Sequence, residues 1–327
     1  MKISNIELGE KPVFLAPMED VTDASFRYIC KYFGADMMYT EFIAADGLIR
    51  DAAKSVAKLG IFDYERPIGI QIYGHDIEPM VEAALLAEQS KPDVIDINFG
   101  CPVRKIAARG AGSGMMQFPD KMVEMTRRIV DAVKIPVTVK TRLGWDESCK
   151  IIVTLAERLQ DAGISAITIH GRTRSQLYKG EADWTLIGEV KKNSRMKIPV
   201  IGNGDIDSEQ KAKAMFDNYG IDAIMIGRAT YGKPWIFRNI KHYLSTRELL
   251  AEPTVAERVD IAKKHFAKSI EVKGERIGLL EMRRHLNCYF KGLPDFKETR
   301  LKLVTTNEPD KIIVLLDFIN ERWGSLN

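Results

Sequence analysis

The chain has 327 residues, of which 45% are hydrophobic and 28% are charged, and its net charge is +3. This composition is typical of a soluble globular protein with a sizeable core. No apolar run reaches the roughly 18 residues that a transmembrane helix needs, and the N-terminus lacks the apolar segment of a secretory signal. We therefore expect a cytoplasmic protein with no membrane partner. The four cysteines form no C-x-x-C pair, so we expect neither a metal site nor a disulfide framework.

The charge is distributed unevenly along the chain. Residues 261–302 contain eleven Lys and Arg against five Asp and Glu, a difference of +6, so the rest of the chain sums to −3. A basic segment beside a mildly acidic body suits the binding of a polyanion. An ordinary solvated helical face has the same composition, and charge alone does not separate the two.

Short apolar runs rich in Val and Ile alternate with stretches of helical periodicity. Eight of these runs are predicted strands: 12–17, 37–42, 67–74, 94–100, 136–144, 166–172, 199–205 and 223–228. They lack clean polar alternation, as parallel strands covered on both faces do. Between them, residues 78–88, 151–160 and 209–216 place apolar side chains at helical spacing. Eight β-then-α units favour an α/β fold, with a (β/α)8 TIM barrel as first choice and a doubly wound sheet as second.

The alternation stops after about residue 240. Residues 245–258, "STRELLAEPTVAER", are typical of a linker followed by a helix start, with Thr254 as N-cap and Glu257 three residues on. From there the patterns are mostly helical. We predict a barrel domain over 1–240 and a small C-terminal helical domain over 241–327.

Polar and small residues recur where the predicted strands end, which is where TIM barrels hold their chemistry. In chain order they are Ala16-Pro17-Met18, Glu41, Gln71, Asn98 and Cys101, Lys140 and Arg142, His170 and Arg172, Asn203-Gly204-Asp205, and Gly227-Arg228. Polar side chains inside apolar strands are costly unless they are satisfied, so this recurrence indicates a site.

The residues of this ring suggest a division of labour. Small residues after the seventh and eighth strands allow backbone N–H groups to approach an anion, and Arg228 adds a fixed charge, as in phosphate sites of this fold. Lys140, Gln71 and His170 lie deeper, where they suit a flat polar heterocycle. A phosphate site beside such donors suggests a mononucleotide cofactor such as FMN.

The glycine-rich stretch "RGAGSGMM", residues 109–116, fits neither of two nucleotide-binding motifs. It lacks the Gly-Lys-Ser/Thr of a Walker A motif, and it comes too long after its strand for a Rossmann fingerprint. We interpret it as a flexible loop over the barrel mouth, with a tight structural turn as the alternative.

Several motifs together resemble the tRNA-dihydrouridine synthases, and most of all their bacterial B-type branch. They are "LAPMEDVTDASFR", "DINFGCPVRKI…GAGSGMM", "VKTRLGWDE", "ITIHGRTRSQLYKGEADW", "PVIGNGDI" and "IMIGRATYGKPWIF", in order from residue 15 to 237, with "MRRHLNCYFKGLP" at 282–294. The resemblance implies an FMN-dependent oxidoreductase that uses NADPH, or NADH, to reduce the C5=C6 bond of uridines in tRNA. It also implies a TIM barrel followed by a helical RNA-binding domain.

The resemblance carries roles for individual residues. It implies that Ala16, Pro17 and Met18 pack around the isoalloxazine, and that Gln71, Lys140 and His170 bond the ring or its side chain. It implies phosphate contacts from Asn203, Gly204, Asp205, Gly227 and Arg228. Cys101 would be the proton donor, Asn98 would contact the target uracil, and Arg172 would hold uracil or RNA.

The chemistry of uracil reduction favours an acid role for Cys101. Hydride adds to C6 and a proton to C5, and a thiol with a pKa near ~8.5 is protonated at neutral pH and can supply that proton. A covalent nucleophile would instead need a lowered pKa.

In the basic helical segment, Arg283 and Arg284 are candidates for contact with the RNA backbone.

Two other functions remain open from the sequence. An FMN barrel could act on a free pyrimidine, as a dihydroorotate dehydrogenase-like enzyme does, or the chain could be a non-catalytic RNA-binding protein. The basic tail argues against the first, and Cys101 with the phosphate-binding residues argues against the second. We expect tRNA and NADPH as partners and a monomer, while the sequence encodes neither the uridine position nor the oligomeric state.

Overall fold

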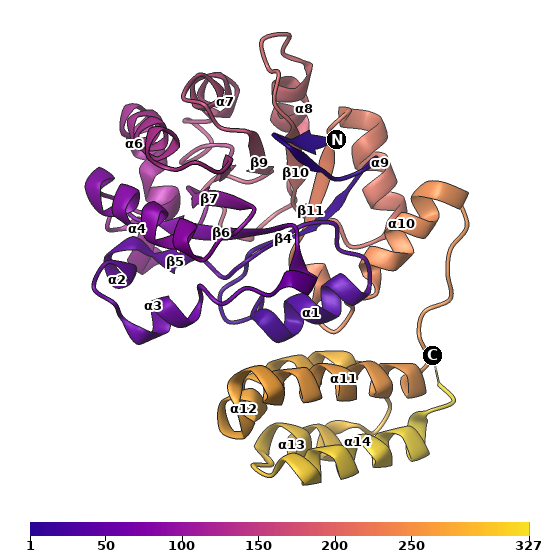
Figure 1. Ribbon diagram of the computed structural model, residues 1–327. Helices are drawn as coiled ribbons and strands as arrows, with labels where there is room; N and C mark the ends of the chain where they lie inside the picture. Colours follow the sequence, from indigo (N-terminus) through magenta and orange to yellow (C-terminus); the bar gives the residue numbers. More distant parts are fainter. Residues whose placement is uncertain (327) are drawn as a thin grey trace.

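The computed structural model describes residues 1–326, whose centre is a closed barrel of parallel strands (Figure 1). The strands are β3 (Val13–Leu15), β4 (Met38–Tyr39), β6 (Ile68–Tyr73), β7 (Val94–Asn98), β8 (Val137–Arg142), β9 (Ala166–His170), β10 (Val200–Asn203) and β11 (Ala223–Ile226). Their order is β3-β11-β10-β9-β8-β7-β6-β4, and a parallel bridge between Phe14 and Met37 closes the ring. The predicted (β/α)8 barrel is confirmed.

Two small additions complete the barrel. β5 (Ile43–Ala44) pairs in parallel with the end of β6. β1 (Lys2–Ile3) and β2 (Ile6–Glu7) form an antiparallel hairpin. The buried side chains of Ile3 and Leu8 share a core cluster with Phe14 and Met37, which shows that this N-terminal segment covers one end of the barrel.

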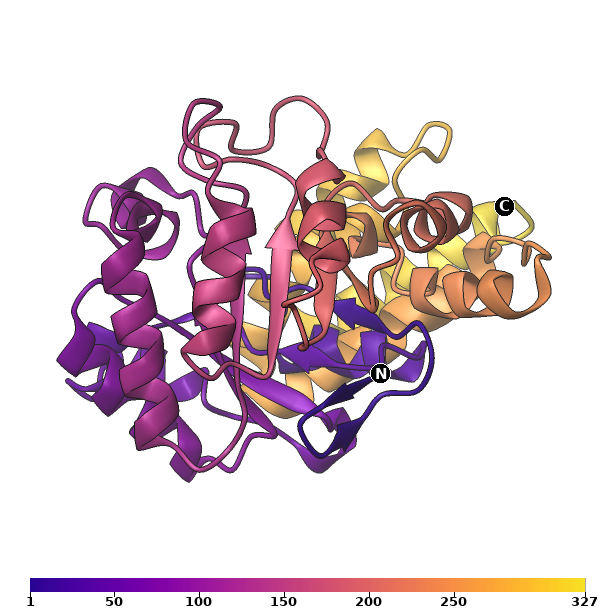
Figure 2. The ribbon, with the colours of Figure 1, turned by 90° about the horizontal axis from the view of Figure 1, so that it is seen from above.

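Helices follow the strands and surround the barrel, as the view from above shows (Figure 2). They are α1 (Ala24–Tyr32), α4 (Ile77–Gln89), α6 (Pro119–Ala132), α7 (Ile152–Asp161), α8 (Thr185–Lys192), α9 (Glu209–Tyr219) and α10 (Ile236–Thr246). The short helices α2 (Ala45–Leu48), α3 (Ala53–Ala57) and α5 (Arg104–Ala107), and the 3-10 turns η1 (Asp63–Glu65), η2 (Gly112–Gln117) and η3 (Arg228–Thr230), lie in the connections. The long helices bury one apolar stripe each, as period 3.6 requires. No helix among residues 1–326 is long and apolar enough to cross a bilayer.

Four helices form a separate layer below the barrel in Figure 1. They are α11 (Val255–Lys273), α12 (Glu275–Tyr289), α13 (Lys297–Thr305) and α14 (Pro309–Trp323), and they bury an apolar cluster that also includes Ile29, Phe33 and Trp235 of the barrel domain. The capping box at the start of α11 is present: the Glu257 N–H donates to Thr254 Oγ1 at 3.3 Å, and the Thr254 N–H donates to Glu257 Oε2 at 2.7 Å. The predicted C-terminal helical region is confirmed.

The division of the chain at residue 240 falls inside α10, which packs against α9 of the barrel. A cut there would separate the two halves of one amphipathic helix. We therefore propose that the domain boundary lies in the extended linker at residues 247–254, after α10 ends and before α11 begins.

Gly202, in the middle of β10, offers a test of how closely the barrel is packed. A Cβ at this position would overlap the ring of Trp184, which is 4% exposed. We expect Gly202→Ala to lower the free energy of unfolding by about 1–3 kcal/mol, because the buried ring has to move or the strand has to shift. Urea denaturation measures this change. Gly60→Ala is the matched control, since its Cβ would meet only Ala57 O at an ordinary 3.5 Å; equal stability of the two variants would contradict the prediction.

Candidate active site

A cavity of about 770 Å³ opens at the carboxyl ends of the strands. Most of the predicted ring lines it: Ala16, Pro17, Met18, Asn98, Cys101, Lys140, His170, Asn203, Gly204, Asp205, Gly227 and Arg228. The residues come from six different strand ends, which the barrel topology brings to one face. Gln71, Arg172, Arg283 and Arg284 are not on its wall.

Gln71 lies beneath the cavity in a fully buried polar network. Its Nε2 donates to Asp96 Oδ2 at 2.5 Å, and its Oε1 accepts from Asn98 Nδ2 at 2.7 Å. Thr138 Oγ1 donates to the other oxygen of Asp96 at 2.5 Å. Burial raises the pKa of Asp96 to about 6, although these two donors act against the shift. Because both ends of the Gln71 amide are used within the protein, the geometry gives this residue the role of holding Asn98; its predicted cofactor contact stays a prediction.

Asn98 in turn shapes the loop that carries Cys101. Asn98 Oδ1 accepts from the backbone N–H groups of Gly100 and Cys101 at 2.9 and 2.8 Å, a turn that asparagine side chains form readily. Arg142 Nε donates to Gly100 O at 2.7 Å, and Ser113 Oγ donates to Cys101 O at 2.8 Å. Three side chains from three segments therefore fix the backbone on both sides of the thiol.

The glycine-rich stretch 109–116 packs behind Cys101 and is not a mobile cover. Residues 112–116 are buried in the turn η2, and Gly112 has a φ of +54°. A Cβ on Gly112 would lie 3.0 Å from Cys101 O, so the glycine permits a close approach of two backbones. The structural turn is the interpretation that the structure supports, and the flexible-loop interpretation is wrong.

The thiol of Cys101 is protonated at neutral pH in this environment. Burial raises its pKa above the usual range, while a backbone N–H bond from Val103 and the charges of Arg142 and Lys140 oppose part of the shift. Cys101 is 7% exposed, yet it lies on the cavity wall. A buried neutral thiol suits an acid better than a nucleophile.

Two basic groups deeper in the cavity have unusual protonation equilibria. Burial, followed by repulsion from Arg142, lowers the pKa of Lys140 to about 8, and Lys140 Nζ donates to Asn203 Oδ1 at 3.2 Å. Burial also lowers the pKa of His170 well below its usual value, with Arg142 and Lys140 adding to the effect. His170 is therefore a neutral imidazole at pH 7, able both to donate and to accept a hydrogen bond.

Asp205, on the cavity wall, forms ion pairs with two arginines, Arg172 and Arg228. It accepts from Arg172 at 2.9 and 2.5 Å and from Arg228 at 2.9 Å. Burial alone would raise its pKa, but the bonds from Arg172 and the Ala182 N–H outweigh burial and lower it. Arg172 is 1% exposed and also donates to the carbonyls of Lys179 and Gly180. The guanidinium of Arg172 is hydrogen-bonded within the protein and ties the loop after β9 to Asp205. These bonds give no support to the predicted contact of Arg172 with uracil or RNA.

The residues on the wall that received no role from the sequence include Arg142, Tyr178 and Tyr231. Arg142 is buried and donates to the carbonyls of Thr173 and Leu177 at 3.0 Å each. Tyr178 is 54% exposed on the rim, with the guanidinium of Arg228 5.0 Å from its ring centroid. Tyr231 lines the cavity from the loop after β11. The sequence marked Arg142 as a polar residue at the end of a strand. The two tyrosines lie several residues after their strands, and no sequence pattern predicts that such loop residues reach the cavity.

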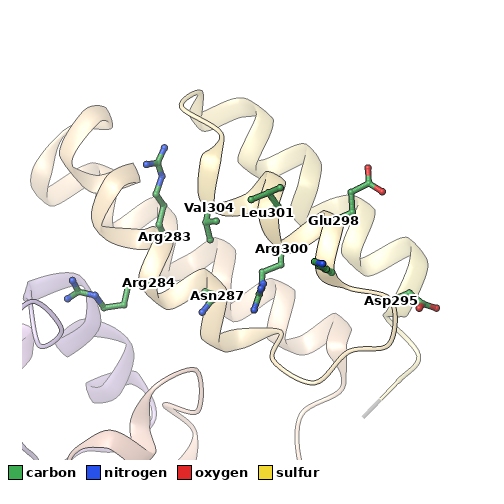
Figure 3. Close-up of a pocket in the computed structure, with 9 residues that line it drawn as sticks. Arg283, Arg284, Asn287, Asp295, Glu298, Arg300, Leu301 and Val304 are labelled. Atoms are coloured by element: carbon green, nitrogen blue, oxygen red, sulfur yellow. The ribbon is translucent and has the colours of Figure 1, made fainter.

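Arg283 and Arg284 border a second cavity, of about 980 Å³, between α12 and α13 (Figure 3). Arg283 donates to Thr306 O at 3.1 Å and to Asn307 Oδ1 at 2.6 Å, and so caps the carboxyl end of α13. Arg284 points toward the barrel, 46% of its side chain is exposed, and its Nη2 lies 3.6 Å from Asp20 Oδ2. The two adjacent arginines therefore differ: Arg283 supports the fold, and Arg284 is available to a ligand.

The donors on the wall fit a mononucleotide flavin. Gly204 (φ +130°) and Gly227 keep the rim open, because a Cβ on Gly204 would meet Ala182 at 2.6 Å and one on Gly227 would meet Met18 at 3.3 Å. The backbone there is free to approach a phosphate, with the half-exposed Arg228 beside it. Lys140 and the neutral His170 face the interior of the cavity, where a polar ring system fits. Fold and site together define a TIM-barrel protein with a ligand-sized cavity at the carboxyl ends of its strands.

The chain belongs to the dihydrouridine synthase family, whose model matches residues 14–321. It is 40% identical over 310 residues to a probable tRNA-dihydrouridine synthase of Rickettsia conorii, covering 94% of this chain and 93% of the relative. It is 38% identical over 298 residues to tRNA-dihydrouridine synthase B of Pseudomonas aeruginosa, covering 91% and 89%. The predicted family is confirmed.

Solved structures share the fold at low sequence identity. A 2-naphthoyl-CoA reductase in complex with 2-naphthoyl-CoA gives a TM-score of 0.57 at 12% identity over 74% of this chain. A histamine dehydrogenase from Rhizobium gives 0.51 at 13% identity over 72%. This chain spans 51% and 47% of those two chains, so the likeness concerns the barrel alone.

The protonation state of Cys101 is open to direct measurement. Because burial raises its pKa, the thiolate fraction at pH 7.5 is small, and we expect the rate of alkylation by iodoacetamide to keep rising with pH above about 8.5. Mass spectrometry of the Cys101 peptide follows the reaction, with Cys101→Ser as the control that loses the signal. A rate that levels off below pH 8 would indicate a lowered pKa and contradict the acid role.

Proposed function

We propose that this protein is a tRNA-dihydrouridine synthase that reduces the C5=C6 bond of specific uridines in tRNA, with FMN bound in the barrel and NADPH, or NADH, as reductant. The observation that carries the proposal is the position of Cys101, whose loop is fixed by hydrogen bonds with Asn98 and Ser113 on the wall of the same cavity that Gly204, Gly227 and Arg228 line. The close relatives bear this activity in their names. A dihydroorotate dehydrogenase-like reaction and a non-catalytic role are disfavoured by the family and by the acid.

The cofactor would be held by residues from both halves of the cavity. Ala16, Pro17 and Met18 supply an apolar wall, Lys140 and His170 supply donors, and Asn203, Gly204, Asp205, Gly227 and Arg228 frame the phosphate end. When bound there, FMN would supply hydride chemistry toward C6 of the uracil, with a nicotinamide as the source of electrons. The remaining steps belong to side chains of the protein.

Cys101 completes the reduction by giving its proton to C5. Once C6 has gained a hydride, negative charge spreads over C5 and the C4 carbonyl. A positioned acid neutralises that charge by protonating C5. The proton leaves the Cys101 sulfur as a C5–H bond forms, and a thiolate remains. Arg142 and Lys140, whose charges already favour the thiolate, stabilise it until a proton returns from solvent. Asn98 fixes the loop and lines the cavity where the uracil edge would lie.

The helical domain would hold the RNA while one uridine enters the cavity. A base inside a folded tRNA must leave its stack to reach Cys101, as in other enzymes that act on bases. Arg284 is half exposed and faces the barrel, so it is placed to bind a phosphate near the cavity mouth. We further propose a monomer that acts in the cytoplasm.

Removal of the thiol separates its acid role from cofactor binding. We expect Cys101→Ala to retain its flavin and to be bleached by NADPH at the rate of the unmodified protein, while uridine reduction falls by about 10²-fold or more. Absorbance of the flavin band measures the first step, and mass spectrometry of digested tRNA measures dihydrouridine. Turnover of tRNA at the original rate would contradict the assignment.

The two arginines of α12 give a second test. We expect Arg284→Glu to weaken tRNA binding and to reduce the slope of log K against log salt by about 1, because one phosphate contact is lost. Titration with labelled tRNA at several salt concentrations measures both quantities. Lys311→Glu, which changes the charge equally in α14, is the control. Equal effects of the two variants would assign the change to net charge and contradict a specific contact.

Arg283→Glu is expected to lower the melting temperature instead, because Arg283 caps α13.

A further inference from the structure

The helical domain contacts the barrel at two seams, and each seam continues directly into a segment that lines the catalytic cavity. The first seam joins the start of α1 to α11 and α12. The second joins residues 231–235 to the end of α12. Figure 1 shows α1 beside α11 and α12, with the linker to α11 running along the side of the molecule. The orientation of the helical domain is therefore set by its packing along α1 and on residues 231–235, together with the contacts of Glu252 in the linker with Trp235 and Lys233.

A buried ion pair lies at the centre of the first seam. Asp23 caps α1, because its Oδ1 accepts from the N–H groups of Ser25 and Phe26 at 2.8 and 3.1 Å. Its other oxygen lies 2.8 Å from Lys273 Nζ, at the end of α11, and the two side chains are 9% and 15% exposed. Burial would raise the pKa of Asp23, but Lys273 and the nearby histidines hold it below its usual value. One carboxylate thus links the first turn of α1 to the last turn of α11.

Two histidines pack against the same turn of α1. The ring of His285 stacks on Phe26 at 4.7 Å, and His265 Nε2 lies 3.3 Å from Ser25 Oγ while its Nδ1 lies 3.0 Å from Tyr289 Oη. Burial lowers the pKa of both imidazoles, that of His285 to about 4, so both are neutral at pH 7. Apolar side chains of similar size would stabilise such a contact at least as well. Directional polar contacts instead define one relative orientation of α1, α11 and α12.

The second seam depends on the absence of a side chain. Gly232 has a φ of +66°, and a Cβ there would overlap the carbonyl group of Cys288. Three residues on, Trp235 stacks with Tyr289 at 6.5 Å between ring centroids. The loop after β11 is therefore pressed against the backbone of α12.

Both seams reach the cavity within a few residues. Thr22, next to Asp23, binds Met18 in both directions: its Oγ1 accepts from the Met18 N–H at 2.9 Å and donates to Met18 O at 3.1 Å. Met18 and Tyr231 line the cavity. A rotation of the helical domain would therefore displace two walls of the site together with any bound RNA.

We propose that the pair Asp23–Lys273 and the contact of Gly232 with Cys288 fix the orientation in which the helical domain presents RNA, and so select the uridine that enters the cavity. Lys273 and Gly232 are positioning residues, since neither touches the cavity. The inference rests on the proposed function. Misplacement of a reacting group by about 1 Å can cost about 10²-fold in rate, so a small rotation is enough to disfavour the original uridine.

The experiment compares seam variants with matched controls in the full-length protein loaded with flavin. Lys273→Met and Asp23→Asn break the ion pair, and Asn retains the acceptor that caps α1. Gly232→Ala forces the second seam apart. Gly220→Ala is its control, because Gly220 has nearly the same φ, +64°, and nothing within 4 Å of an added Cβ. Lys263→Met is the control for Lys273→Met, since it removes the ion pair with Asp317 inside the helical domain.

Four quantities are measured for each variant: bleaching by NADPH, the dissociation constant for tRNA, kcat/KM for tRNA, and the positions of dihydrouridine in the product. We expect the seam variants to keep bleaching and tRNA affinity within about twofold while kcat/KM falls by about tenfold or more, or while the modified position changes. Lys273→Arg, which keeps the charge, is expected to restore activity at the original position. The two controls should match the unmodified protein.

Two results would overturn the inference. One is unchanged kcat/KM and unchanged positions in all the seam variants. The other is a loss of activity that follows the loss of tRNA affinity and melting temperature equally in seam variants and controls, because the seams would then act only through stability. Failure of the unmodified protein to form dihydrouridine would instead overturn the proposed function on which the inference rests.

Discussion

The site depends on one constraint: polar groups inside the barrel must be hydrogen-bonded, and one chain of such bonds ends at the reactive thiol. Thr138 and Gln71 satisfy Asp96, Gln71 orients the Asn98 amide, and Asn98 holds the N–H groups of Gly100 and Cys101. Each member is buried, so each would be costly if its partner were lost. The position of Cys101 is therefore set by residues on three neighbouring strands, and three of these residues, Gln71, Asp96 and Thr138, do not line the cavity.

Charge in the cavity is arranged for an anionic ligand and for a transient anion. Asp205 pairs with Arg172 and Arg228, while Lys140 and Arg142 lie deeper and bond to Asn203 Oδ1 and to backbone carbonyls. The guanidinium of Arg228 suits a phosphate at the rim, and the charges of Arg142 and Lys140 lower the cost of a thiolate after proton transfer. Burial acts in the opposite direction on Cys101 and keeps the thiol protonated before the reaction. The same surroundings thus keep Cys101 as a neutral thiol before the reaction and partly stabilise its thiolate afterwards.

The helical domain is integrated with this chemistry through the loops on which it rests. The segments that begin after β3 and after β11 each line the cavity first and then meet α11 or α12. A barrel can present substrate-binding loops at only one face, so an appended domain that handles a large substrate has to be attached close to that face. Attachment through an apolar cluster shared by both domains, through polar contacts at Asp23 and through the close approach at Gly232 leaves little freedom in the angle between the two domains.

The sequence by itself determined the strand and helix order, the helical tail, the capping box at Thr254 and the positions of polar strand ends, because these depend on local periodicity and on the fixed direction of parallel strands. It did not distinguish Asn98, on the cavity wall, from Gln71 beneath it, or Arg228, on the rim, from the buried Arg172. Nor did it separate Arg283 from Arg284, or reveal that residues 109–116 support Cys101 from behind. Those assignments belong to the tertiary structure, because the direction and availability of a side chain depend on partners that lie far away in the chain, such as Asp205 for Arg172 and the end of α13 for Arg283.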